Sequence, residues 1–253
     1  MRAYELIKET FFRRTYIWVV HLVWLALYGM YWWLFLPDLA DWGRFVLIWG
    51  GLLLALALSA GIFGDDIASG RICVLATKPF WSGYLYIYRM VGLSLQAAVH
   101  LLLAGCLIIV LQSLTRRVNM NGLALWLLAS WLLFNACAAL STSLSVVVER
   151  AFNSLVILFF AVTGYVIVAL LASELRGQSE PPMLQEIIRY ACPPFELLQK
   201  FAGGEHGQYS LTFGRFSTTK AAACIVHALV LTIAYSTIGI VLLCRRDFSR
   251  VRD

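Results

Sequence analysis

Charged residues are scarce in this sequence of 253 residues: only 13% are Asp, Glu, Lys or Arg, whereas 61% are hydrophobic. A soluble domain of this size needs more polar surface than such a composition provides. Charge is missing altogether from six long apolar stretches, each near or above the roughly 20 residues that cross a ~30 Å hydrocarbon layer as a helix. These stretches also lack the alternating pattern of barrel strands, so we expect six membrane-spanning helices. They comprise residues 16–36, 45–64, 90–114, 122–148, 154–173 and 221–244.

Catalytic and nucleotide-binding motifs are missing as well. The sequence has neither the H-E-x-x-H zinc motif nor the G-x-S-x-G nucleophile elbow, and His206 has no second histidine four residues away. None of its lysines lies in the G-x-x-x-x-G-K-[ST] loop that binds ATP phosphates. We therefore expect a chain that is not an enzyme and that binds no metal or cofactor of its own.

The polar residues inside the apolar stretches are uncharged. Proton pumps and ion-coupled carriers usually have charged residues in mid-membrane, so the absence of Asp, Glu, Lys and Arg from these stretches disfavours an ion-coupled carrier. For the histidines we expect hydrogen bonds between helices, with a ligand or proton-relay role as the alternative. The polar set is His21, Gln96, His100, Asn135, Ser141, Thr142, Ser143, Ser145, Thr163 and His227.

The basic residues predict the orientation in the membrane. With six spans, both termini lie on one side, where the short segments hold twelve Lys and Arg residues, against three on the other side. The positive-inside rule then places both termini in the cytoplasm, although Arg116 and Arg117 run against this count. Residues 1–15 mix basic and apolar residues at helical spacing, which predicts an amphipathic helix on the membrane surface. The net charge of +6 is thus explained by topology and not by nucleic-acid binding.

Two connections are longer than turns, within what we expect to be a single transmembrane domain over residues 1–253. The cytoplasmic segment 65–89 contains charges, glycines, Pro79 and several aromatic residues, which predicts a short surface helix followed by a turn. Asp65 and Asp66 at its start suit the positive end of a helix dipole. The extracytoplasmic segment 174–220 contains four prolines and apolar residues at helical spacing, which predicts short amphipathic or re-entrant helices.

The cytoplasmic segment resembles that of ABC-2 type transporter permeases. In that family an acidic residue, a glycine about four positions later, a leucine, a basic–Pro pair and an aromatic stretch connect spans two and three. The corresponding residues here are Asp66, Gly70, Leu75, Lys78, Pro79 and then Arg89. The layout of an amphipathic N-terminal helix, six spans and a proline-bearing outer segment is also similar. The acid is Asp where the family more often has Glu, and Ser82–Gly83 stands where an Arg is common.

This resemblance implies an all-α, ABC-2 type permease fold and a role as the membrane-spanning subunit of an exporter in the bacterial inner (plasma) membrane. It implies a separate ABC ATPase dimer that binds ATP and Mg, and a second permease subunit in a homodimer or heterodimer. Aromatic and small residues of spans two and five would line the path, but the substrate is not indicated. The alternative is a membrane anchor or regulatory subunit that transports nothing. The residues expected to couple to the ATPase are Asp65, Asp66, Gly70, Arg71, Leu75, Lys78 and Pro79, with Glu149 and Arg150 as a second contact.

Overall fold

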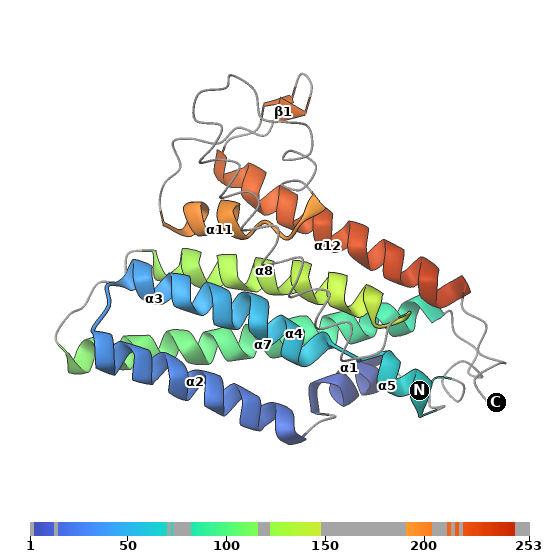
Figure 1. The fold of residues 1–253 in the computed structure, drawn as a ribbon, viewed down its shortest axis with the longest axis horizontal. Helices are drawn as coiled ribbons and strands as arrows, with labels where there is room; N and C mark the ends of the chain where they lie inside the picture. The colour runs from blue at the N-terminus through green and yellow to red at the C-terminus, as the bar shows by residue number, and fades with distance from the viewer. Residues whose placement is uncertain are drawn as a thin grey trace, which may run out of the picture.

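The computed structural model describes residues 3–12, 15–69, 72, 82–115, 122–147, 191–203, 212–213, 216–217 and 220–245. This part of the chain is mostly helical (Figure 1). Its only β structure is the antiparallel pair of two-residue strands β1 (Thr212–Phe213) and β2 (Phe216–Ser217). The expected helical class is confirmed for the described residues.

Five helical segments in the described ranges are long and apolar enough to cross a membrane, as in a multi-pass membrane protein. Four are single helices: α2 (Thr15–Phe35), α7 (Ser82–Leu114), α8 (Leu123–Leu144) and α12 (Lys220–Arg245). The fifth is a succession of α3 (Leu39–Val46), η1 (Leu47–Leu53) and α4 (Leu54–Ser59), followed by the short α5 (Gly64–Ala68). The apolar stretch 154–173 lies outside the described residues.

In chain order, the first four of these segments lie alongside one another in alternating directions, and α12 runs in the same direction as α8 (Figure 1). α1 (Ala3–Phe12), α5 and the beginning of α7 gather at one end of the bundle, which we name the α1 end. α3 and the beginning of α8 lie at the opposite end, the α3 end. Close contacts agree with this arrangement, because the Tyr86 hydroxyl donates a hydrogen bond to the carbonyl of Ala139, late in α8, at 3.1 Å. Gly239, late in α12, also lies against the Tyr86 ring, so the chain runs toward the α1 end in both α8 and α12.

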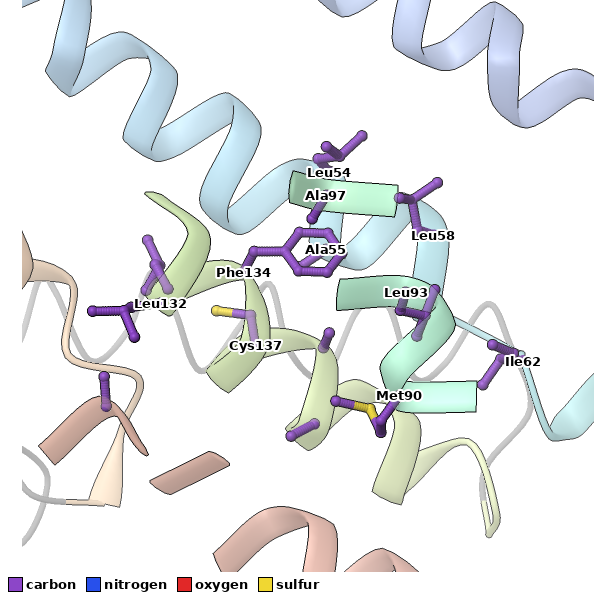
Figure 2. Close-up of a cluster of buried hydrophobic side chains, with 14 of the residues drawn as sticks. Leu54, Ala55, Leu58, Ile62, Met90, Leu93, Ala97, Leu132, Phe134 and Cys137 are labelled. Atoms are coloured by element: carbon purple, nitrogen blue, oxygen red, sulfur yellow. The ribbon is translucent and has the colours of Figure 1, made fainter. Parts of the chain in front are cut away.

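The core of the bundle is built around α8. Figure 2 shows Phe134 of α8 among Leu54 and Ala55 of α4 and Ala97 of α7, all of them buried. A second cluster, rich in aromatic residues, joins α2, α3 and α7 nearer the α3 end and includes Tyr28, Trp32 and Trp42. By contrast, α2 and α12 expose much of their apolar surface, as helices that face lipid do.

Two helices begin at an earlier residue than the uncharged stretches in the sequence predict. α7 begins at Ser82 instead of residue 90, because Leu85 and Tyr86 are buried and the charge of Arg89 is compensated inside the protein. The segment expected to reach residue 89 therefore ends in residues that belong to helix α7. At the other end of the bundle, α3 begins at Leu39 instead of residue 45. The Asp38 side chain accepts a hydrogen bond from the N–H of Asp41 there and caps the helix.

Span two is not a regular α-helix. In η1 the backbone forms a π-helix, and the N–H of Leu54 bonds to the carbonyl of Trp49, five residues earlier. The same carbonyl accepts a hydrogen bond from the indole N–H of Trp24 on α2, at 2.7 Å. Beyond Ser59 the chain turns through Gly61, whose positive φ of 73° favours glycine, and α5 then begins as a separate helix.

Residues 191–203, in the segment 174–220, pack against α8 and α12. α11 (Phe195–Ala202) buries Leu197, Leu198 and Phe201 against the core, as its amphipathic pattern predicts. The Tyr235 hydroxyl, midway along α12, donates a hydrogen bond to the carbonyl of Ala191. The last residue of α11 lies near Gly122 at the beginning of α8. Residues 191–202 thus run from the middle of α12 to the α3 end, in the manner of a re-entrant segment.

Candidate functional site

Two of the nine residues expected to contact an ATPase, Asp65 and Asp66, lie among the described residues. Both fall in the first turn of α5, where the helix dipole favours a carboxylate. The hydroxyl of Ser69 donates a hydrogen bond to the carbonyl of Asp65 at 2.7 Å and closes the other end of this short helix. The remaining seven lie outside the described residues: Gly70, Arg71, Leu75, Lys78, Pro79, Glu149 and Arg150.

Asp66 lies inside the protein and not on the expected surface. Its side chain is fully buried, and its Oδ2 lies 3.1 Å from Nη2 of Arg89, which is fully buried too. A buried carboxylate needs a cation and hydrogen bonds to offset its lost hydration. Asp66 therefore cannot touch another subunit in this structure, and it holds α5 against α7.

The amphipathic helix α1 completes this ion pair. Arg89 Nη2 lies 3.3 Å from Oε1 of Glu9, and Arg89 Nη1 donates a hydrogen bond to the Thr10 hydroxyl at 3.0 Å. Close approach is possible because residue 92 is glycine: a Cβ at Gly92 would lie 2.7 Å from Cβ of Thr10. One guanidinium thus joins three elements, and we name Glu9, Thr10, Asp66 and Arg89 the Arg89 cluster.

A second contact, one turn away, fixes the orientation of α5 relative to α7. The rings of Phe63 and Tyr86 stack with centroids 5.6 Å apart and an interplanar angle of 11°. Each ring precedes its ion-pair residue by three positions, so the aromatic and ionic contacts follow one another along the same helix faces. The Tyr86 ring also packs on α12, where a Cβ at Gly239 would lie 2.4 Å from it. α5 is therefore attached at two points to a helix that itself contacts α8 and α12.

The length of α7 bears on the depth at which the Arg89 cluster would lie in a membrane. α7 has 33 residues and is about 50 Å long, whereas the hydrocarbon layer is ~30 Å thick. If its last residue, Leu114, lies at one edge of the hydrocarbon, about 20 residues span the layer and the other edge falls near residue 95. Arg89 then lies beyond the hydrocarbon, where charge is less costly than in mid-membrane.

A cluster of two histidines and a tyrosine ties α2 to α7. Nδ1 of His21 and Nδ1 of His100 are 3.1 Å apart, and the Tyr28 hydroxyl lies 3.2 Å from Nε2 of His100. The expected hydrogen bonding between helices is confirmed for these two histidines. Among the described residues no group of three or more His, Cys, Asp or Glu side chains could hold a metal ion.

Sequence reasoning missed two members of the Arg89 cluster and the role of a third. Arg89 was expected in a loop, and Glu9 and Thr10 were expected only to form part of a surface helix. The signal was present, because an arginine within the apolar sequence YLYIYRMVG needs a buried acid. The sequence does not say which acid, since Glu9 and Asp66 are far from Arg89 along the chain.

Known proteins give no direct guide to the function. No protein-family model matches this chain, and no curated protein matches it either. The function is therefore inferred from the sequence pattern and from the Arg89 cluster.

Proposed function

We propose that this chain is the membrane-spanning permease subunit of an ABC-2 type transporter, an exporter driven by a separate ATPase subunit. One observation carries the proposal. Asp66 stands at the head of the segment that resembles the family's coupling segment, and Arg89 joins it to α7 and α1. A movement of this segment would therefore be transmitted to a spanning helix through a buried ion pair, which a flexible loop could not do.

The sequence supports a borrowed source of energy. Without a phosphate-binding loop, the chain needs another subunit to hydrolyse ATP. Without Asp, Glu, Lys or Arg in its six apolar stretches, it lacks the charged residues that usually couple transport to an ion gradient. An ABC ATPase dimer, binding ATP and Mg, supplies the energy in this proposal. A second permease subunit completes the path across the membrane.

Six spans and cytoplasmic termini belong to the same proposal. α8 and α12 run in the same direction (Figure 1), so two such spans need a return crossing between them, for which the apolar stretch 154–173 is long enough. The greater number of basic residues belongs to the segments at the α1 end, which supports placing that end in the cytoplasm of a bacterial cell.

The proposed coupling divides labour between two sets of residues. Because Asp66 is buried, docking falls to the residues after α5, in particular Arg71 and Lys78, with Glu149 and Arg150 as a smaller contact. The Arg89 cluster then transmits the movement as a positioning unit. Displacement of α5 pulls on α7 through Asp66 and Arg89, and on α1 through Glu9 and Thr10.

The two roles can be separated by experiment. The chain is co-expressed with candidate ABC ATPase subunits, purified in detergent and reconstituted in liposomes. Charge reversal at the docking residues, in Arg71→Glu with Lys78→Glu, should abolish co-purification of the ATPase. Asp66→Asn should leave co-purification intact and lower the stimulation of ATP hydrolysis by the permease, because the ion pair that transmits the movement is lost.

Arg44→Gln is the matched control. Arg44 is a partly exposed arginine at the α3 end, so its replacement should change neither binding nor hydrolysis. If both the docking and the Asp66 variants behave like wild type, the proposed coupling site is wrong. If the ATPase binds but no candidate substrate is exported and hydrolysis is unaffected by the permease, the chain is a membrane anchor instead.

A further inference from the structure

The helix α1 has two different faces. One face is held by the bundle: Leu6 and Thr10 are buried, and Thr10 is bound by Arg89. The opposite face carries Tyr4, Lys8 and Phe12 at four-residue spacing, and all three side chains are exposed, as is Glu5 beside them. We name these three residues the outer stripe of α1. The Arg89 cluster fixes the direction in which this stripe points.

The outer stripe is continuous with the lipid-facing surface of α2. The ring centroids of Phe12 and Trp18 are 6.3 Å apart. The ring of Phe11 contacts both of them, at 4.9 Å from Phe12 and 5.6 Å from Trp18. One and four residues beyond Trp18, Val19 and Leu22 are exposed on α2. Aromatic residues at the end of a spanning helix mark the boundary between hydrocarbon and headgroups. This continuity favours a lipid surface, and not a protein, as the occupant of the stripe.

The depth of α1 agrees with this occupant. α1 contacts α7 at Arg89, Gly92 and Gln96. The contact at Gln96 is a 3.4 Å hydrogen bond that its side-chain amide donates to the carbonyl of Phe11. These positions flank residue 95, where the hydrocarbon edge falls when α7 is placed in a ~30 Å layer. The outer stripe therefore lies at the level of lipid phosphates.

The charge of the segment selects the kind of lipid. Residues 1–15 hold four basic residues and two acidic ones, and one of the acids, Glu9, already pairs with Arg89. Lys8 lies exposed between two aromatic side chains, and Arg13 and Arg14 follow α1 directly in the sequence. We propose that the outer stripe of α1 binds the headgroups of anionic phospholipids in the leaflet at the α1 end. This inference does not depend on the proposed transport function.

Lipid selectivity of the full-length chain tests the proposal. The purified protein is titrated in detergent with phosphatidylglycerol and, separately, with phosphatidylcholine, and bound lipid is measured by native mass spectrometry. Wild type should retain the anionic lipid more strongly, and added salt should weaken the difference. Lys8→Gln should lower the apparent affinity for phosphatidylglycerol by roughly fivefold, which corresponds to the loss of one basic residue at an anionic surface.

Two controls keep the result interpretable. Arg44→Gln removes an exposed basic residue at the α3 end and should leave lipid selectivity unchanged. Lys8→Gln should have the thermal stability of wild type, because the buried face of α1 is untouched. Equal selectivity in wild type and Lys8→Gln would overturn the proposal, as would an equal loss in Arg44→Gln. Unchanged selectivity together with the loss of a purified protein partner would instead identify the stripe as a protein contact.

Discussion

Replacing Arg89 with Gln removes the positive charge that Asp66 and Glu9 share. The side chain of Glu9 is 17% exposed and can be hydrated, but that of Asp66 is fully buried and cannot. The variant therefore removes the guanidinium that lies 3.1 Å from a buried carboxylate, while Gln preserves part of the volume and some hydrogen-bonding capacity of Arg89. The loss falls on the contact that joins α5 to α7.

The expected magnitude follows from this geometry. Removing one partner of a fully buried ion pair costs about 3–5 kcal/mol. For a chain of this size, each kcal/mol lowers the unfolding temperature by about 2–4 °C, so Arg89→Gln should unfold about 6–20 °C below wild type. Asp66→Asn should cost less, about 1–3 kcal/mol, because Arg89 keeps Glu9 and Thr10 as partners.

The double variant Asp66→Asn with Arg89→Gln separates the ion pair from general damage. It contains no isolated buried charge at these two positions, so its unfolding temperature should lie above the value obtained by adding the two single effects. A coupling of about 0.5–3 kcal/mol is expected for groups in direct contact. Thermal unfolding in one detergent, followed by size-exclusion chromatography of the heated samples, measures all four proteins together.

Additive single effects would refute this reasoning, because they would mean that the two side chains do not interact. An Arg89→Gln protein as stable as wild type would also refute it, since the burial of Asp66 would then be incorrect. A loss in Asp66→Asn larger than in Arg89→Gln would show that Glu9 and Thr10 do not hold Arg89 when Asp66 is neutral.

Three further substitutions test the packing by thermal unfolding. His100→Leu removes two interhelical hydrogen-bond contacts of α2 at once and should cost about 1–3 kcal/mol; an unchanged unfolding temperature would mean that α2 is held by apolar contacts alone. Gly239→Ala places a methyl group 2.4 Å from the Tyr86 ring and should cost about 1–3 kcal/mol by overpacking. Gly29→Ala is its matched control, because the added methyl group meets only an ordinary contact at 3.8 Å, and it should not destabilise the protein. Equal effects of the two glycine variants would contradict the packing of α7 on α12.

The helices were predictable from sequence because a membrane imposes a simple rule. Each apolar stretch long enough to cross has to satisfy its backbone internally, so a helix follows from composition alone. The rule fails where a charge is compensated by distant residues. The charge of Arg89 made α7 seem to begin at residue 90, although it begins at Ser82, and the charge of Arg44 had the same effect on α3.

The candidate site was predictable only in part. The position of Asp66 in the first turn of a short helix follows from local sequence, whereas its burial does not. Burial depends on Gly92, which lies one turn from Arg89 on the same face of α7 and lets α1 approach closely enough for Glu9 to contact Arg89. Such three-way packing couples residues that are about 20 to 80 positions apart, as the Asp66–Arg89 and Glu9–Arg89 separations show. This three-way contact cannot be predicted from any local sequence pattern.

The π-helix η1 has a consequence for how this protein should be compared with others. Bonding over five residues takes up one residue more than a regular turn, which resets the angular phase between α3 and α4 by about 100°. A helical wheel drawn through residues 39–59 therefore assigns one of the two halves to the wrong side. An alignment of distant homologues needs a one-residue gap within Leu47–Leu53 wherever the homologue has an uninterrupted α-helix.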